Sequence, residues 1–255
     1  MIDPWNRSPR GDPCGRPDWE TAAASTRDGP VIGELNERSL HRALKAHYAV
    51  PGSLTEQAID GYVADIVIDG RIIEIHTGIF WPLKRKLPRL LERNRVTLVH
   101  PIARDRYIVK PTADGQGIMS RRMSPKHGSV FAIFAALASI PTVLAHSNFT
   151  LEIVITVEEE VRVPHERRNR RRGGWTAVDR RLVEIVETHR IEAMADLFSM
   201  LDAELPAEFT TTDLARAMRL SRRLGQQAAF CFRAAGLSEI CGKVGNALVY
   251  RRTPS

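Results

Sequence analysis

Two carboxylates, Asp65 and Glu74, stand in the apolar segment at residues 62–78, YVADIVIDGRIIEIHTG. Between them lies Asp69-Gly70, a strong signal for a two-residue turn, which predicts a β-hairpin with Asp65 opposite Glu74. Acids directly opposite on neighbouring strands have Cβ atoms about 5 Å apart and repel each other. A divalent metal relieves that repulsion, because hard cations bind carboxylate oxygens. The hairpin therefore predicts a metal site; the alternative is an edge hairpin whose acids face water or pair with arginine.

The alternation of side chains along this hairpin indicates a sheet covered on both faces. The turn predicts three further pairs, namely Ile68 with Arg71, Val67 with Ile72, and Ile66 with Ile73. One face would carry Val63, Asp65, Val67, Ile72, Glu74 and His76. The other would carry Tyr62, Ala64, Ile66, Ile68, Ile73 and Ile75. Both faces are mostly apolar, as in a buried sheet, where an unpaired carboxylate would be costly.

A helix is predicted upstream of the hairpin, at residues 36–48, because Leu40, Leu44 and Tyr48 recur at helical spacing. Glu37 falls within that apolar stripe, flanked by His41. An acid on the buried side of a helix is unusual and therefore informative. The alternative is a carboxylate favoured at the helix start by the helix dipole.

The following elements alternate between helix and strand, which predicts an α/β sandwich. We expect a loop at 51–57, a basic helix at 82–94 and a buried helix at 130–139. The basic helix would turn Leu83, Leu87, Leu90 and Leu91 inward. Strands are predicted at 96–102, 106–110 and 151–163, and a long loop at 111–129.

The C-terminal third reads as helical, followed by a hairpin. We expect one long helix at 181–203, with Leu182, Ile185, Val186, Met194, Leu197 and Leu201 inward. A short helix, DLARAM, is capped by Thr211 or Thr212, and a second helix at 222–235 ends at Gly236. Strands at 237–241 and 247–251 complete a helix-turn-helix with a β-wing. Gly225 has no evident role, although glycine costs about 1 kcal/mol in mid-helix.

Composition narrows the class of protein. The 255 residues are 43% hydrophobic, which suits a globular chain with a real core. The three cysteines have no metal-binding spacing and cannot all pair, which indicates a reducing compartment, and we expect the cytoplasm. The apolar run at 130–145 is too short to cross a bilayer, so no membrane partner is expected. Residues 1–30 read as a disordered tail.

Basic residues gather in separate segments. The net charge is +7 and the pI about 9.7. Residues 84–95 carry six basic residues and one acid, and residues 209–252 carry eight against two. Residues 167–172 hold five arginines. Such patches favour a polyanionic partner, and we expect DNA.

These residues resemble a known superfamily. The first part, roughly residues 33–110 and extending toward 163, resembles the PD-(D/E)XK (restriction-endonuclease-like) nucleases. Their αβββαβ core carries an acid on the first helix, an Asp on one strand and Glu-X-Lys on the next. The matching positions here are Glu37, Asp65 and Glu74-Ile75-His76. GELNERSLHRALK and IEIHTGIF also resemble a bacterial domain family of unknown function within it, and the C-terminal part resembles winged helix-turn-helix domains.

The resemblance implies metal-dependent phosphodiester hydrolysis. Asp65 and Glu74, with Glu37 added directly or through water, would hold Mg²⁺ or Mn²⁺. His76 departs from the motif, because active members usually carry Lys there. His76 itself, or Lys84 or Lys86 from the basic helix, would replace that lysine. The alternative is a degenerate site that binds without cutting.

DNA contacts are expected on two helices. Arg85 and Arg89 would touch phosphates beside the site. At the start of the second C-terminal helix, arginine can read guanine and glutamine adenine, which makes candidates of Arg222, Arg223, Gln226 and Gln227. Lys243, Arg251 and Arg252 would contact phosphates. The alternative is a winged helix that binds protein.

The sequence therefore predicts an α/β protein with a nuclease-like domain at 31–165, an Arg/Gly-rich linker at 166–178 and a winged helix-turn-helix at 179–255. Three functions remain open. They are a metal-dependent nuclease acting on DNA, an inactive nuclease fold that serves as a DNA-binding regulator or adaptor, and a protein–protein module. A homodimer is also left open.

Overall fold

A computed structural model describes residues 39–112, 114–164, 174–201 and 205–253. All of them belong to one compact unit, Glu37–Ser255. Glu37, the tail at 1–30 and the arginine run at 167–172 lie outside the described residues.

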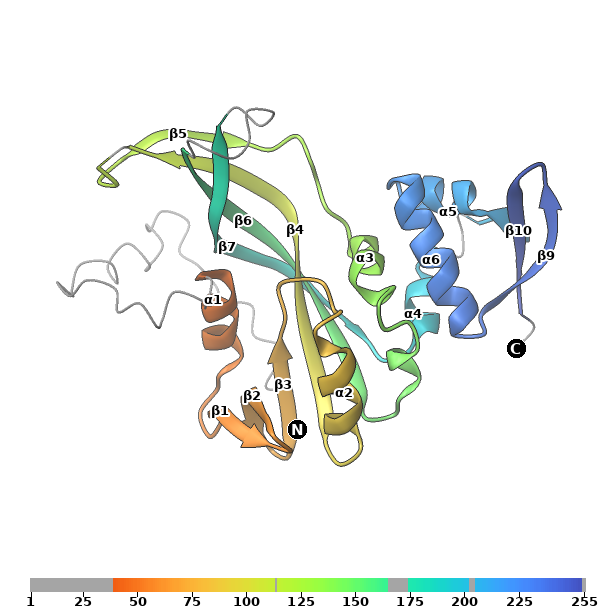
Figure 1. The fold of residues 1–255 in the computed structure, drawn as a ribbon, viewed down its shortest axis with the longest axis horizontal. Coiled ribbons are helices and arrows are strands. Elements are labelled where there is room, and N and C mark those ends of the chain that lie inside the picture. Colours follow the sequence, from red (N-terminus) through yellow and green to blue (C-terminus); the bar gives the residue numbers. More distant parts are fainter. Residues whose placement is uncertain (1–38, 113, 165–173, 202–204, 254–255) are drawn as a thin grey trace. The chain divides into compact units, whose positions relative to one another are not determined.

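The described chain is mixed α/β, with a large sheet and helices on it (Figure 1). Its first elements are α1 (Ser39–Tyr48), β1 (Leu54–Ile59), β2 (Tyr62–Ile68), β3 (Arg71–Ile75), α2 (Leu83–Leu91) and β4 (Arg95–Pro111). Then come β5 (Ile118–Met123), the 3₁₀ turn Val130–Ile133, α3 (Phe134–Leu137), a second 3₁₀ turn at Val143–Ala145, β6 (Phe149–Pro164) and β7 (Trp175–Ile191). The chain continues with α4 (Met194–Ser199), β8 (Glu208–Thr210), α5 (Thr211–Ala217), α6 (Arg222–Ala234), β9 (Ser238–Val244) and β10 (Ala247–Arg252).

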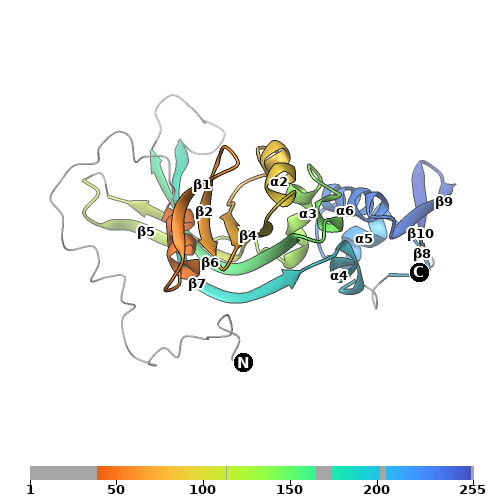
Figure 2. The same cartoon turned by 90° about the horizontal axis from the view of Figure 1, so that it is seen from below.

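The large sheet has seven strands in the order β1-β2-β3-β4-β6-β7, with β5 paired to β4. Strand β4 runs parallel to both β3 and β6, and the other pairs are antiparallel. Figures 1 and 2 show β4, β6 and β7 as long, bent strands. The sheet centre is therefore parallel, which is typical of strands covered on both faces.

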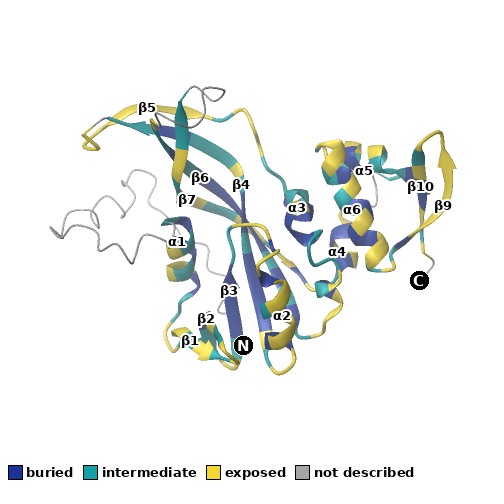
Figure 3. Ribbon diagram, viewed as in Figure 1, coloured by how far each residue is buried: buried dark blue, intermediate teal, exposed yellow. Residues whose placement is uncertain are grey.

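Helices α1 and α2 cover opposite faces of this sheet, as the alternation of the hairpin requires. Leu40, Leu44 and Tyr48 of α1 pack on the cluster that includes Ile66 and Ile73. The predicted inward residues of α2, Leu83, Leu87, Leu90 and Leu91, are all buried in the other cluster. Figure 3 shows the buried residues concentrated along β3, β4 and the inner helix faces.

The predicted loop at 51–57 is wrong for its second half, because strand β1 begins at Leu54. It pairs with β2 through a turn at Asp60-Gly61, where both residues have positive φ (50° and 79°). This is the backbone that Asp-Gly turns favour. The β1–β2 pair is therefore a second Asp-Gly hairpin beside the first.

The predicted helix at 181–203 is also wrong for residues 181–191, which belong to β7 and pair with β6. Residues 175–178, assigned to the linker, lie in the same strand. Three register shifts each place one extra residue on β7, at Val178, Val183 and Val186. A bulge breaks the two-residue alternation of a strand. Leu182, Ile185 and Val186 were therefore spaced as in a helix, although they lie in a strand. Helix begins only at α4.

The other corrections concern length. Strand β4 replaces the two predicted strands at 96–102 and 106–110, since a bulge at Ala103–Asp105 bends it without ending it. Strand β5 occupies part of the predicted loop at 111–129. The buried helix predicted at 130–139 begins as a 3₁₀ turn and continues as α3.

The C-terminal part has the predicted helix–turn–helix–hairpin order and a small sheet, β8-β10-β9. The cap of α5 is Thr210, one residue before the two predicted ones. Its hydroxyl accepts from the amides of Thr212 and Asp213, while the Asp213 carboxylate accepts from the amide of Thr210. This reciprocal pair is a capping box. Gly236 ends the second helix at φ 73°, as expected.

Gly225 has a packing role that the sequence did not reveal. A Cβ built on it would lie 2.2 Å from the Thr211 carbonyl oxygen and 3.0 Å from the Ala215 amide, both in α5. The two helices therefore approach so closely that only glycine fits. This close approach offsets the helix propensity that glycine loses.

In the part of the chain that the structure describes, no helix is both long and apolar enough to cross a membrane.

Candidate functional site

The hairpin that carries the two acids forms with the predicted turn. Asp69 and Gly70 have φ of 49° and 70°, as a type I′ turn requires. The predicted pairs of Ile68 with Arg71, Val67 with Ile72 and Ile66 with Ile73 are all present. The fourth predicted pair, Asp65 with Glu74, is absent from the ladder, so the two strands separate at the acids.

Asp65 occupies the point of separation. Its Oδ2 accepts a hydrogen bond of 2.8 Å from the Ile75 amide, which the β2 backbone does not reach. The same oxygen lies 3.3 Å from Nε2 of His41 on α1. A side-chain carboxylate thus replaces a strand contact and holds the two strands apart.

Glu74 lies on the other side of this gap and is buried, with 4% of its surface exposed. Its Oε2 accepts a hydrogen bond of 2.6 Å from Nζ of Lys86 on α2. Lys86 also donates to the Val63 carbonyl at 2.6 Å. The other carboxylate oxygen, Oε1, is buried and has no hydrogen-bond partner among the described residues.

The two acids differ in pKa. Burial raises the pKa of Glu74, Lys86 opposes that shift, and the nearby charge of Asp65 adds to it. Burial alone would raise the pKa of Asp65, but the hydrogen bonds from His41 and the Ile75 amide outweigh it and lower the pKa. Asp65 bonds to α1 and Glu74 to α2, on opposite faces of the sheet. The prediction that both acids lie on one face of the hairpin is therefore wrong. The charge of Asp65 nevertheless acts on Glu74.

The His76 ring is hydrogen-bonded within its own loop. Its Nε2 donates to the Ile79 carbonyl at 2.7 Å, and its carbonyl accepts from Nδ1 of His100 at 2.6 Å. Burial lowers the pKa of the His76 ring, which favours the neutral form near neutral pH. His76 therefore does not provide the permanent charge of a lysine at this position.

Of the two predicted replacement lysines, Lys86 reaches Glu74. Lys84 instead lies over the Trp81 ring, 5.1 Å from its centroid. Helix α2 presents its position 86 inward and its position 84 outward. Glu37, the predicted third ligand, lies outside the described residues. Within residues 39–253, excluding the undescribed gaps, no three His, Cys, Asp or Glu side chains form a metal-binding group.

The predicted DNA-contacting residues are mostly exposed. Arg85 and Arg89 are exposed on α2. Arg222, Arg223 and Gln226 are exposed on the first turns of α6, and Gln227 is half-buried. Lys243 is exposed on β9, Arg251 pairs with Glu239 at 2.7 Å, and Arg252 lies over the Phe198 ring.

The sequence reasoning missed two features near this site. Trp81 and Ile79 are 63% and 65% exposed in the loop between β3 and α2, beside the exposed basic face of α2. Arg106 and Arg180 converge on Glu158, a fully buried acid of β6. The signal for the second was the acidic triplet at 158–160 inside an apolar strand.

Comparisons with known proteins identify a family model and a relative that match this chain. A family model described as a domain of unknown function, DUF8091, matches residues 38–192, which run from α1 to the end of β7. The chain is 32% identical over 205 residues to an uncharacterized protein of Treponema pallidum (strain Nichols), covering 76% of this chain and 81% of that protein. No solved structure matches. The chain therefore belongs to the DUF8091 family, whose domain contains the whole Asp65–Glu74 site.

Proposed function

We propose that this protein is a metal-dependent nuclease-like protein that acts on DNA. The observation that carries the proposal is the Glu74 carboxylate, which is buried beside Lys86 with one oxygen unpartnered among the described residues. An unmet buried acceptor costs about 1–3 kcal/mol, and more when it is charged. A fold retains such a group where a bound cation offsets the cost.

The order of elements supports the same reading. The chain runs α1-β1-β2-β3-α2-β4 before the long β6 and β7, which is the αβββαβ order of the PD-(D/E)XK core. Asp65 lies on β2 and Glu74 on β3, at the positions that the motif requires. Lys86 brings a permanent cation to the acid pair from α2, where His76 does not.

The residues fit a hard divalent cation such as Mg²⁺ or Mn²⁺. Asp65 and Glu74 would hold it, with the Ile75 carbonyl. Carboxylate and carbonyl oxygens are the ligands that such ions take. A cation held by these residues would supply Lewis-acid polarisation of a phosphoryl oxygen and activation of water.

The chain's own residues would position that water and the phosphate. Lys86 holds Glu74 with a hydrogen bond of 2.6 Å and would supply positive charge near the phosphoryl oxygens, where negative charge develops. His41, hydrogen-bonded to Asp65, keeps that carboxylate ionised and fixes its orientation. The exposed Arg85 and Arg89 on the same helix as Lys86 would bind flanking phosphates.

DNA as the substrate is supported by the C-terminal part. Helices α5 and α6 with the β9–β10 hairpin have the order of a winged helix-turn-helix, in which the second helix enters the major groove. Arg222, Arg223 and Gln226 stand exposed at the start of α6, where such a helix meets base edges.

A second candidate function is an inactive nuclease fold that binds DNA as a regulator or adaptor. It is favoured by the contacts of the two acids, which bond to helices on opposite faces of the sheet. In that case Lys86 alone neutralises Glu74, and the DNA-contacting helices act without the metal.

A cleavage assay separates the two functions. Linear, branched and single-stranded DNA would be incubated with the full chain in Mg²⁺ or Mn²⁺, beside Glu74→Gln and the control Glu192→Gln, an exposed acid paired with Arg190. We expect cleavage by the native chain and by the control, and none by Glu74→Gln. DNA binding without cleavage in all three proteins would instead support the regulator.

A further inference from the structure

A second site is indicated by a cleft of about 1000 Å³ on the part of the sheet beyond His76. Its wall begins at residues 77–79, directly after the motif, and continues along β4, β7 and the 124–128 loop, with α3 on one side. Ligand sites in proteins typically measure about 300–1,000 Å³. The cleft is therefore large enough for a molecule of nucleotide size.

Basic side chains outnumber acidic ones in the lining of this cleft. Arg106, Arg162, Arg180 and Lys126 line it, and Glu160 is the one carboxylate among its lining residues in the described chain. Arg106 and Arg162 are about one-third exposed and Arg180 one-fifth. With the buried Glu158 included, four cations face two carboxylates, which leaves a surplus of two positive charges.

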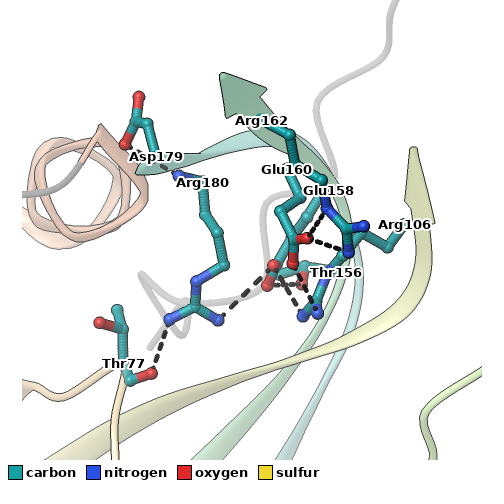
Figure 4. Close-up of polar contacts among 8 residues, drawn as sticks. All are labelled: Thr77, Arg106, Thr156, Glu158, Glu160, Arg162, Asp179 and Arg180. Carbon is teal, nitrogen blue, oxygen red and sulfur yellow. Dashed lines mark hydrogen bonds and ion pairs between the residues drawn. The ribbon is translucent and has the colours of Figure 1, made fainter. Parts of the chain in front are cut away.

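The carboxylates of Glu158 and Glu160 lie between the arginine side chains and set their directions (Figure 4). Glu158 is fully buried, and its Oε1 accepts from the Thr156 hydroxyl at 3.1 Å. Its Oε2 lies 3.3 Å from Arg106 and 3.7 Å from Arg180. An acid whose two oxygens are both engaged provides a rigid base for these guanidinium groups.

Further contacts hold Arg180 and Arg162. Arg180 donates to the Thr77 carbonyl at 2.7 Å, so the cleft wall is tied to the loop that follows the motif. Arg162 bonds to Glu160 at 2.6 Å. The guanidinium groups are thus positioned before any ligand binds, and preorganisation of this kind raises affinity.

We propose that this arginine cleft binds a phosphate-bearing ligand of nucleotide size. Planar guanidinium groups match the oxygens of a phosphate through paired hydrogen bonds, which a lysine cannot reproduce. The source of the phosphate is either a free nucleotide or the end of a nucleic-acid strand. The site is distinct from the Asp65–Glu74 pair and needs no metal, so it does not rest on the proposed nuclease function.

The test is calorimetric titration of the full chain in EDTA with inorganic pyrophosphate, adenosine diphosphate and a single-stranded, end-phosphorylated oligonucleotide. The variants are Arg162→Gln and Arg180→Lys. The matched control is Arg190→Gln, which removes an ion-paired arginine from the same strand as Arg180. Thermal melting of each protein verifies that it is folded.

We expect the native chain to bind and Arg162→Gln to lose about tenfold in affinity, as for a lost charge-assisted hydrogen bond. Arg180→Lys should weaken binding although the charge is kept, and Arg190→Gln should bind as the native chain does. Binding of the nucleotide or pyrophosphate identifies a small ligand, and binding of the oligonucleotide alone identifies a strand end; both support the cleft.

No binding of any probe by the folded native chain would overturn the proposal. An equal loss in Arg162→Gln and Arg190→Gln would overturn it too, since diffuse surface charge would then explain the binding. Repeating the titration with Glu74→Gln distinguishes the arginine cleft from the Asp65–Glu74 site. Phosphate binding should survive that change, whether or not metal binding and cleavage are lost.

Discussion

Two buried glutamates on the same sheet, Glu74 of β3 and Glu158 of β6, have opposite hydrogen-bonding environments. Glu158 is fully buried, and both of its oxygens have partners, Thr156 on one side and Arg106 with Arg180 on the other. Glu74 is 4% exposed and bonds to Lys86 through one oxygen, while the other has no partner among the described residues.

The difference separates a structural acid from a candidate functional one. A fully satisfied buried network makes a fold rigid and specific, whereas a half-satisfied one costs free energy that folding alone does not recover. Burial raises the pKa of Glu74 against the opposing charge of Lys86. We therefore propose that the metal binds at Glu74, whose Oε1 has no hydrogen-bond partner among the described residues.

The largest effect on stability is expected from Glu158→Gln. The change leaves Arg106 and Arg180 without their buried counter-charge, and arginine cannot shed its proton to escape the penalty. We expect a loss of about 3 kcal/mol in the free energy of unfolding, measured by urea denaturation.

Its control is Glu159→Gln at the next position of β6, where the carboxylate pairs with the half-exposed Arg121. That change should cost less than about 1 kcal/mol. Equal losses in the two variants would mean that Glu158 has no special structural role.

Lys86→Met should have the next largest effect, about 2 kcal/mol at neutral pH, because it leaves Glu74 buried without a cation. Its cost is smaller than that of Glu158→Gln because a carboxyl can take up a proton. Lys84→Met, on the exposed side of the same helix, is the control and should stay within about 0.5 kcal/mol.

The pH dependence of Lys86→Met has a definite sign. The pKa of Glu74 is already raised by burial, and losing Lys86 raises it further. A raised pKa means that the folded state holds the proton more tightly, so stability falls as pH rises above 4.5. Urea denaturation should show native and variant converging in acid; a gap that widens there would contradict the assignment.

Asp65→Asn should cost about 1 kcal/mol at neutral pH, since the amide still accepts from Ile75 but loses its charge toward His41. The folded pKa of Asp65 is lowered, so its contribution is present above pH 3.8 and is lost as pH falls below that value. Denaturation of both proteins across this range checks it, with Asp69→Asn at the turn as the control. A cost that persists in strong acid would argue against the charged contact.

The smallest effect is expected from Glu74→Gln, within about 1 kcal/mol, because the burial penalty of the carboxylate is removed while the amide oxygen still accepts from Lys86, whose side chain keeps 17% of its surface in water. A small change in the free energy of unfolding for Glu74→Gln, beside a large loss for Glu158→Gln, would distinguish the two glutamates most clearly. A destabilisation of Glu74→Gln as large as that of Glu158→Gln would make Glu74 a structural acid as well.

The hairpin could be predicted from sequence because its information is local. Asp69-Gly70 determined the turn, and the turn determined three strand pairs. The same reasoning applied to Asp60-Gly61 predicts the turn that joins β1 to β2. Strand β7 could not be predicted in this way, because its bulges depend on pairing with β6 and are not encoded in the residues of β7 alone.

The residue types of the site could be predicted from the sequence, whereas the contacts between their side chains could be predicted only in part. Asp65, Glu74 and Lys86 were all named from the sequence, and the structure brings Lys86 to Glu74. Which of Lys84 and Lys86 reaches inward depends on the rotation of α2, which its leucines determine. The separation of β2 from β3 at Asp65 depends on a hydrogen bond to the Ile75 amide, which no residue pattern encodes.

The most direct test of a metal site at Asp65 and Glu74 is a calorimetric titration of the full chain with Mn²⁺, without DNA. We propose that Oε1 of Glu74, which has no partner within the described part of the chain, binds a divalent metal together with Asp65. We expect binding by the native chain and by Glu192→Gln, and loss of that binding in Glu74→Gln and in Asp65→Asn. Unchanged Mn²⁺ affinity in a folded Glu74→Gln variant would contradict it.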